Sequence, residues 1–235
     1  MRFSIAIGLL FFVASPAIAE DVVSAEYAAP TTRYAHGVLG DAIEHDSLVM
    51  ETAGGRRFRV DLPERRVFED TEPRLFDVDG DGQREVIVVE SDMELGARLA
   101  IYGPEGLVAS NEFIGRSSRW LAPVGLAAAD LDGDGSVELA FVDRPHLAKT
   151  LRIFRFEPET LVLVGEYPGV TNHRIGERDI AGGIRDCGAG PAMIVADASW
   201  RRILAITFDG VGFQTSDLGE HKDRASFNSA LNCQD

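Results

Sequence analysis

The chain of 235 residues carries 38 acidic and 23 basic side chains, with a formal net charge of −15. Nucleic acid is therefore not expected as a partner, because phosphate backbones are bound by clustered lysine and arginine. With 45% hydrophobic residues the chain can bury one substantial core, which predicts a single domain over residues 20–235.

The first 19 residues are typical of a secretory signal peptide. Arg2 supplies the charged start, an apolar stretch runs from Ile5 to Val13, and Ala17-Ile-Ala19 forms a small-residue cleavage motif. We expect cleavage after Ala19 and a periplasmic or secreted location. No membrane span is expected, because no run approaches the roughly 20 apolar residues of a spanning helix.

Short apolar runs, separated by Gly, Pro, Asn and Asp, recur along the rest of the chain with a period of about 53 residues and are typical of strands. Four runs per period indicate the blade of a β-propeller. A helical solenoid is not supported, because no stretch sustains apolar residues at helical spacing. We therefore predict an all-β protein, a β-propeller of about four blades, each a four-stranded antiparallel sheet. The predicted strands are 38–39, 48–50, 58–60 and 67–68; 75–76, 86–89, 99–102 and 107–109; 126–129, 139–142, 151–154 and 161–164; and 180–181, 193–195, 203–206 and 211–213.

The approximate blades are residues 35–70, 74–118, 124–168 and 178–220. The tail at 221–235 is expected to close the ring or to be pinned to it, since closure leaves no free sheet edge. A fifth, incomplete blade, built from residues 22–34 together with the tail from Phe227, is the alternative.

Two acidic loops are the most specific signal in the sequence. The run Asp77-Val-Asp79-Gly-Asp81-Gly-Gln83-Arg-Glu85 recurs as Asp130-Leu-Asp132-Gly-Asp134-Gly-Ser136-Val-Glu138. Four carboxylates in nine residues repel one another unless a hard cation lies among them, and oxygen ligands at this density favour calcium. The predicted ligands of two structural calcium sites are the carboxylates of Asp77, Asp79, Asp81 and Glu85 with the Gln83 carbonyl, and those of Asp130, Asp132, Asp134 and Glu138 with the Ser136 carbonyl. Gly80, Gly82, Gly133 and Gly135 are expected to adopt positive φ angles.

A helix–loop–helix calcium hand is not supported, because it needs a glutamate at loop position 12, where this chain has Val88 and Phe141. The D-x-D-G-D-G-x-x-E loops, each followed by an apolar strand, instead resemble the FG-GAP or VCBS repeats of integrin-alpha-like propellers. The resemblance covers residues 74–170 best. It implies a calcium-stabilised β-propeller on a secreted or cell-surface protein, used for adhesion, ligand binding or as a scaffold beside enzymatic modules.

The third repeat lacks the acidic loop. Alignment by its apolar run places Ile184, Asp186, Gly188, Gly190 and Ala192 at the ligand positions, so one carboxylate survives and no calcium is expected. Cys187 lies in the same loop, and a disulfide between Cys187 and Cys233 fits an oxidising compartment. Two separate buried thiols are the alternative.

No catalytic motif stands out in the sequence. There is no nucleophile elbow, and the five histidines form no H-x-x-x-H or H-x-H pair that would indicate zinc. Arginine and tryptophan are favoured at recognition surfaces. The alternative is that the tryptophan is wedged between blades and the arginine is solvated. The residues of a candidate ligand face are Arg119, Trp120, Asn172, His173, Arg174 and Trp200.

The function that these observations favour is a monomeric, secreted calcium-binding propeller that binds a protein or carbohydrate ligand or serves as a scaffold, without catalytic residues. A secreted hydrolase or lyase on the same frame is one alternative. A calcium-dependent lectin is another.

Overall fold

The computed structural model describes residues 20–234, so the predicted signal peptide at 1–19 lies outside the described residues. The prediction of an all-β protein is confirmed, because this part of the chain contains seventeen strands and one short helix. The elements are β1 (Val22–Thr31), β2 (Glu44–Thr52), β3 (Arg57–Asp61), β4 (Arg66–Phe68), β5 (Arg74–Phe76), β6 (Glu85–Asp92), β7 (Gly96–Gly103), β8 (Gly106–Ser110), β9 (Leu121–Ala129), β10 (Glu138–Asp143), β11 (Thr150–Glu157), β12 (Glu159–Pro168), β13 (Val170–Thr171), β14 (Gly183–Asp186), β15 (Pro191–Asp197), β16 (Arg202–Phe208), β17 (Phe213–Glu220) and α1 (Arg224–Leu231).

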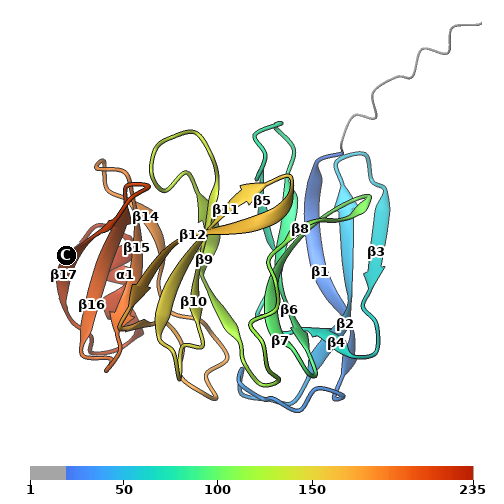
Figure 1. Cartoon of the computed structure of the whole chain (residues 1–235), viewed down its shortest axis with the longest axis horizontal. Coiled ribbons are helices and arrows are strands. Elements are labelled where there is room, and N and C mark those ends of the chain that lie inside the picture. Colours follow the sequence, from blue (N-terminus) through green and yellow to red (C-terminus); the bar gives the residue numbers. More distant parts are fainter. Residues whose placement is uncertain (1–19, 235) are drawn as a thin grey trace, which may run out of the picture.

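The strands follow one another across the molecule in a row, from β1–β3 at the right of Figure 1 to β16 and β17 at the left. Hydrogen bonds join them into two sheets. The larger has twelve strands, in the order β1-β2-β4-β6-β7-β8-β12-β11-β10-β9, with β3 and β5 attached beside it. The smaller has five, in the order β13-β15-β16-β17, with β14 attached to β15. Strand pairs are antiparallel except β8 with β12, which pair in parallel.

A four-stranded antiparallel unit recurs along this row. In its most regular copy, β9, β10, β11 and β12 are successive neighbours. In the copies on either side the innermost strand is interrupted, so β4 and β5 both pair with β6, and β13 and β14 both pair with β15. β9 has a register shift at the corresponding place. The repeat predicted from the acidic loops therefore has a direct structural counterpart.

Most of the predicted strands are confirmed, including residues 86–89 in β6, 139–142 in β10 and 203–206 in β16. These segments are buried along most of their length: every residue of β6 and β10 is buried. Continuous apolar runs of this kind form central strands because both faces of the sheet are covered.

Three of the predicted strands are wrong or displaced. Residues 38–39 lie in a turn, because Gly37 and Gly40 on either side adopt φ angles of 62° and 91°. Their expected place beside β2 is taken by β1. Residues 180–181 precede β14, and β17 begins only at Phe213, after a turn that exposes Val211.

The carboxy-terminal tail forms a helix, which the sequence analysis did not predict. Asp223 caps α1, because its Oδ1 accepts a hydrogen bond from the Ser226 backbone N–H at 3.2 Å while the Ser226 side chain reaches back to the Asp223 backbone. Phe227 and Ala230 bury one face of the helix against the smaller sheet. Within residues 20–234 the tail does not pair with β1, so it does not close a ring of strands.

The predicted disulfide is present between Cys187 and Cys233, whose Cα atoms are 6.0 Å apart. It joins the β14–β15 loop to the end of α1 and so holds the tail against the last unit. Among the described residues, no helix is long and apolar enough to cross a membrane.

Neighbouring units also contact each other along their inner strands, such as β9 and β14. Gly125 in β9 has a φ of +63°, and a Cβ at this position would lie 2.8 Å from the Cα of Gly183 in β14. Only glycine permits both this backbone conformation and this contact. The main apolar cluster continues across the junction, from β6 and β7 through β9 and β10 to β15 and β16.

Candidate functional site

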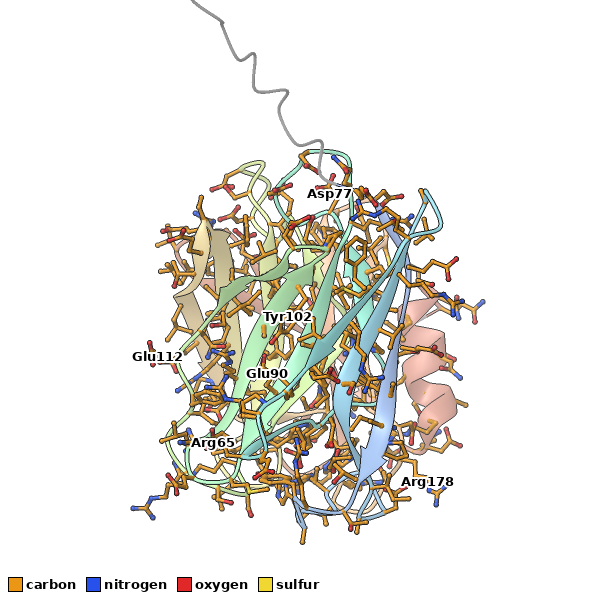
Figure 2. All side chains as sticks on the ribbon, turned by 90° about the vertical axis from the view of Figure 1, so that its right-hand side faces the viewer. Arg65, Asp77, Glu90, Tyr102, Glu112 and Arg178 are labelled. Carbon is orange, nitrogen blue, oxygen red and sulfur yellow. A yellow bond between two sulfur atoms is a disulfide. The ribbon has the colours of Figure 1, made fainter. Side chains whose placement is uncertain are left out.

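The two acidic loops occupy equivalent places in successive units. The first connects β5 to β6 and the second connects β9 to β10. Figure 2 shows Asp77 at one end of the molecule and Arg178 at the other. Glu85 and Glu138 are the first residues of buried strands, so the core fixes the position of one carboxylate in each loop.

The loops share one hydrogen-bond pattern. In the first loop, the pairs are Gly80 N–Asp77 Oδ1 (2.8 Å), Gly82 N–Asp77 Oδ2 (2.9 Å), Asp81 N–Asp79 Oδ1 (3.1 Å), Gln83 N–Asp81 Oδ1 (2.8 Å) and Val78 N–Glu85 Oε2 (3.0 Å). In the second, they are Gly133 N–Asp130 Oδ1 (2.7 Å), Gly135 N–Asp130 Oδ2 (3.1 Å), Asp134 N–Asp132 Oδ1 (3.2 Å), Ser136 N–Asp134 Oδ1 (2.8 Å) and Leu131 N–Glu138 Oε2 (2.9 Å). The loop glycines have the expected positive φ angles, 77° and 88° in the first loop and 77° and 92° in the second. This backbone conformation curls each loop around its own carboxylates.

Three of the predicted ligands converge in the first loop. One oxygen from each of Asp77, Asp79 and Glu85 lies within 4.8 Å of the others. Asp81 lies outside this group, where its side chain accepts a hydrogen bond from the Gln83 backbone. Burial, reinforced by the neighbouring aspartates, raises the pKa of Glu85 to about 7. The cluster therefore concentrates negative charge that no side chain of the loop neutralises.

The second loop brings together Asp130, Asp132 and Glu138 in the same way, again with oxygens within 4.8 Å of one another. Asp134 lies outside this group. Both clusters consist only of hard oxygen donors, on loops whose turns also present backbone carbonyls. This donor set fits calcium, and neither cluster offers the nitrogen or sulfur ligands that zinc and copper prefer.

An arginine distinguishes the second loop from the first. Arg155 in β11 is the strand partner of Glu138, and its guanidinium bonds Glu138 Oε1 at 2.7 Å, Asp132 Oδ2 at 2.5 Å and Asp134 Oδ2 at 3.1 Å. In the preceding unit the register of β6 with β7 puts Gly103 in the place of Arg155. The second cluster is thus partly neutralised from within the chain.

The basic residue of the first loop does not play this role. Arg84 points to Asp21 instead, with its Nη2 2.7 Å from Asp21 Oδ2. The first cluster is therefore the one with the larger unbalanced negative charge.

The equivalent loop of the last unit, between β14 and β15, carries a single aspartate. Asp186 Oδ1 accepts hydrogen bonds from the backbone N–H groups of Gly188 at 2.7 Å and Gly190 at 3.1 Å. The disulfide at Cys187 lies in the same turn. A covalent link is thus found at the position where the two preceding units have an acidic cluster.

The residues of the predicted ligand face do not form one surface. Trp120, Asn172 and His173 are buried: the indole N–H of Trp120 donates to the Glu69 carbonyl at 2.7 Å, and the Asn172 amide donates to two backbone carbonyls of β9. The His173 ring packs edge-on against Trp120. For Trp120 the alternative interpretation, a tryptophan wedged between units, describes its environment.

Of the remaining three residues of that prediction, Arg174 and Trp200 contact each other, whereas Arg119 lines a cavity together with Trp120. The Arg174 guanidinium lies over the Trp200 ring, 4.2 Å from its centroid. Trp200 in turn contacts Phe227 of α1.

Sequence reasoning missed a set of buried acids at the ends of the central strands. Glu90 and Asp92 in β6 are fully buried and pair with Arg98 and Arg65, and the Tyr102 hydroxyl donates to Glu90 (Figure 2). The sequence feature that could have indicated them is an acidic residue directly after an apolar run, as in Glu90-Ser-Asp92. Because acids also follow apolar runs at exposed strand ends, that signal does not reveal burial.

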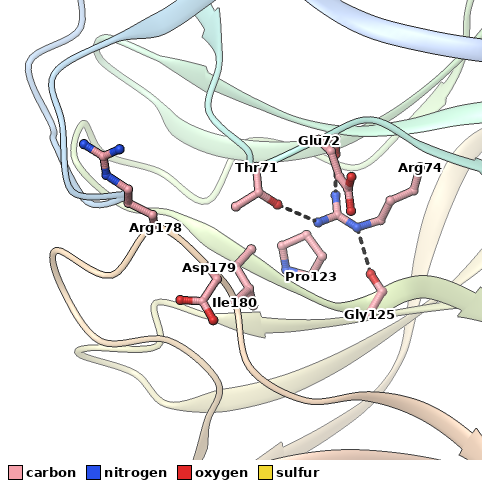
Figure 3. A pocket seen from close by; sticks show the side chains of 8 residues that line it. All are labelled: Thr71, Glu72, Arg74, Pro123, Gly125, Arg178, Asp179 and Ile180. Carbon is pink, nitrogen blue, oxygen red and sulfur yellow. Dashed lines mark hydrogen bonds between the residues drawn. The ribbon is translucent and has the colours of Figure 1, made fainter. Parts of the chain in front are cut away.

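One cavity of about 350 Å³ lies where the inner strands meet (Figure 3). Its buried arginine, Arg74, is fully engaged: it bonds Asp70 at 2.5 Å and the carbonyls of Gly125 at 2.8 Å and Glu72 at 2.9 Å. Arg178 extends away from these groups. This cavity is therefore built around a satisfied ion pair whose arginine also bonds a carbonyl of the neighbouring unit.

A smaller cavity of about 230 Å³ is lined by groups of a different kind. They include His36, Arg119, Trp120, Arg144 and His146. None of the five belongs to an acidic loop.

Comparison with protein families gives one match, an FG-GAP-like repeat over residues 77–141. This segment begins at Asp77 and includes both acidic loops and the strands between them, so the chain contains an FG-GAP repeat, as the sequence pattern indicated. No curated protein and no solved structure matches the chain.

Proposed function

We propose that this FG-GAP repeat-containing protein is a secreted or periplasmic, calcium-stabilised scaffold of the β-propeller type that binds a ligand. The observation that carries the proposal is the pair of matched carboxylate clusters, at Asp77, Asp79 and Glu85 and at Asp130, Asp132 and Glu138. The two loops have five equivalent hydrogen bonds each and the same backbone turn. Acidic residues that lay close together by chance would not repeat this geometry.

The propeller part of the proposal is supported by the repeated four-stranded unit. Its inner strands lie side by side, with β5 against β9 and β9 against β14, as the innermost strands of adjacent blades do. We assign four blades, the first of them built around β1, β2 and β3. In this arrangement the acidic loops share one end of the molecule and stiffen the turn that enters the central strand of a blade.

A structural role for the cation is supported by where the ligands come from. All three carboxylates of each cluster belong to one continuous loop, so the ion fixes a local turn. Glu85 and Glu138 connect that turn to buried strands. A bound cation therefore offsets the free-energy cost of burying these two negatively charged carboxylates. Because Arg155 already neutralises part of the negative charge of the second cluster, we propose that the first loop binds calcium more tightly than the second.

A location outside the cytoplasm is supported by the disulfide, since such bonds persist in oxidising compartments. The proposed signal peptide at 1–19 agrees with this location.

Isothermal titration of calcium into the chain from residue 20 onward tests the proposal. We expect saturable binding that Asp79→Asn weakens most strongly and that Asp132→Asn affects less. Asp186→Asn, the same change in the equivalent loop of the last unit, is the matched control and should leave binding unchanged. Absence of calcium uptake by the wild-type chain, or equal loss in all three variants, would refute the proposal.

A further inference from the structure

The smaller cavity lies among loops of the β1–β2, β8–β9, β10–β11 and β13–β14 connections, remote from the acidic loops. Its rim carries two large apolar side chains, Leu147 and Ile175, which are 75% and 72% exposed. Ile175 lies three residues from Arg178, which Figure 2 places at the opposite end of the molecule from Asp77. The cavity therefore belongs to a different surface from the calcium loops.

A buried polar framework holds one wall of this cavity. Glu69 is fully buried, and its carboxylate bonds His36 Nδ1 at 2.5 Å and accepts a hydrogen bond from the Ser91 hydroxyl. The backbone carbonyl of Glu69 accepts the indole N–H of Trp120. A carboxylate without an arginine or lysine partner is costly to bury, and such groups cluster at functional sites. Here the buried glutamate fixes the orientation of the His36 ring beside the cavity.

Two residues of the lining have strained backbones. Ser118 and Arg144 adopt φ angles of 56° and 45°, which residues other than glycine rarely adopt. Each is held by its surroundings: the Ser118 N–H donates to the Tyr34 hydroxyl at 2.9 Å, and the Arg144 N–H donates to the Trp120 carbonyl at 2.9 Å. Strain that the rest of the fold maintains is typical of ligand sites.

The charges around the cavity are unequal. Arg144 is neutralised by Asp143, which it contacts through two bonds of 2.7 Å. The Arg119 side chain, by contrast, forms no hydrogen bond or ion pair with any part of residues 20–234. The chain has a net charge of −15, yet this guanidinium has no acidic partner in the described part of the chain and lies beside an apolar cavity. It is therefore available to form an ion pair with the anionic group of a bound ligand.

From this geometry we infer that the cavity binds a small apolar monocarboxylate. The carboxylate pairs with Arg119, and the apolar chain lies against Trp120, Leu147 and Ile175. The volume, below that of pockets for drug-sized ligands, restricts the occupant to a short acid. This inference rests on the proposed binding function but not on the calcium loops.

Binding of 4-methylpentanoate, followed by changes in amide chemical shifts of the labelled chain, tests the inference. Its neutral counterpart 4-methylpentanamide should bind about tenfold more weakly or worse, because it lacks the charge that Arg119 recognises. Arg119→Met should weaken the acid by a similar factor and leave the amide unaffected. Arg116→Met removes an equal charge three residues away and is the matched control, expected to bind like wild type.

The comparison of acid with amide on the wild-type chain needs no variant and so does not depend on how a substitution folds. Equal binding of acid and amide, or equal losses in the Arg119 and Arg116 variants, would overturn the inference. Binding only of a peptide such as Gly-Gly-Leu, through its terminal carboxylate, would also overturn it in favour of a peptide site. Calcium titration of the same samples separates the two proposals, since a failed cavity leaves calcium uptake intact.

Discussion

Replacing Arg155 with methionine should make the second loop bind calcium more tightly. In the absence of calcium, the same change should destabilise the protein. The guanidinium makes three contacts of 2.5–3.1 Å to Asp132, Asp134 and Glu138, of which Asp132 and Glu138 are almost or fully buried. Removing one partner of a buried ion pair costs about 3–5 kcal/mol. Because Arg155 is a quarter exposed, solvent screening reduces this cost, and we expect a loss of about 2–3 kcal/mol.

Calcium should restore much of this loss. With a dissociation constant typical of extracellular modules, about 10⁻⁴ to 10⁻³ M, about 10 mM calcium adds roughly 1.4–2.7 kcal/mol for each occupied site. The free energy of unfolding of the Arg155→Met variant should therefore increase more on calcium addition than that of the wild type, by up to the contribution of one site.

Urea unfolding in chelator and in calcium measures both effects. Arg98→Met is the matched control: Arg98 pairs with the buried Glu90 at 3.0 Å, away from both loops. This control should be destabilised equally in the two buffers. An Arg155→Met variant whose calcium response equals that of wild type would refute the idea that the arginine stands in for a cation.

Two further predictions concern stability. The Cys187→Ser/Cys233→Ser double variant should lose up to about 4 kcal/mol of unfolding free energy through loop-closure entropy, and its urea midpoint should no longer respond to reductant; a midpoint equal to that of the oxidised wild type would contradict this. Burial raises the pKa of Glu44 to about 9, with Glu69, Asp41 and Asp70 adding to the effect, so the folded state retains a proton that the unfolded state releases above its usual pKa near 4.5. The free energy of unfolding should therefore fall as pH rises from about 5 to 9, and Glu44→Gln should remove that fall. The variant should be about 1 kcal/mol or more stable than the wild type at pH 8 and equally stable at pH 4. Parallel pH profiles of the two proteins would count against this prediction.

The acidic loops and the central strands were predictable because their signals are local. Spacing of the carboxylates, the glycines between them and the apolar run that follows all lie within about a dozen residues. Residues 86–89 and 139–142 form strands for the reason that the sequence suggests, namely that a continuous apolar run is buried on both faces.

The errors arose where the signal was short or ambiguous. Val38 is as buried as a strand residue, but it reaches the core from a turn between two glycines. The helix α1 has only eight residues and two buried positions, Phe227 and Ala230, so its periodicity is weak. Its capping residues, Asp223 and Ser226, were the signal available in the sequence.

The cavity beside His36 was beyond sequence reasoning because it depends on contacts between distant residues. His36 meets Glu69, 33 residues later, and Glu69 meets Trp120, 51 residues further on. Nothing in the local pattern around any of the three indicates these partners. Trp120 was selected as a surface residue because tryptophan is common at interfaces, but the same side chain is equally suited to a wall between units.

The central claim, that a divalent cation stabilises the acidic loops, is tested most directly by calorimetric melting of the wild-type chain in chelator, in calcium and in an equal concentration of magnesium. We predict a melting temperature several degrees higher in calcium than in chelator, a smaller effect of magnesium, and a strongly reduced calcium effect in the Asp79→Asn variant. Identical melting temperatures of the wild-type chain in chelator and in calcium would contradict the account.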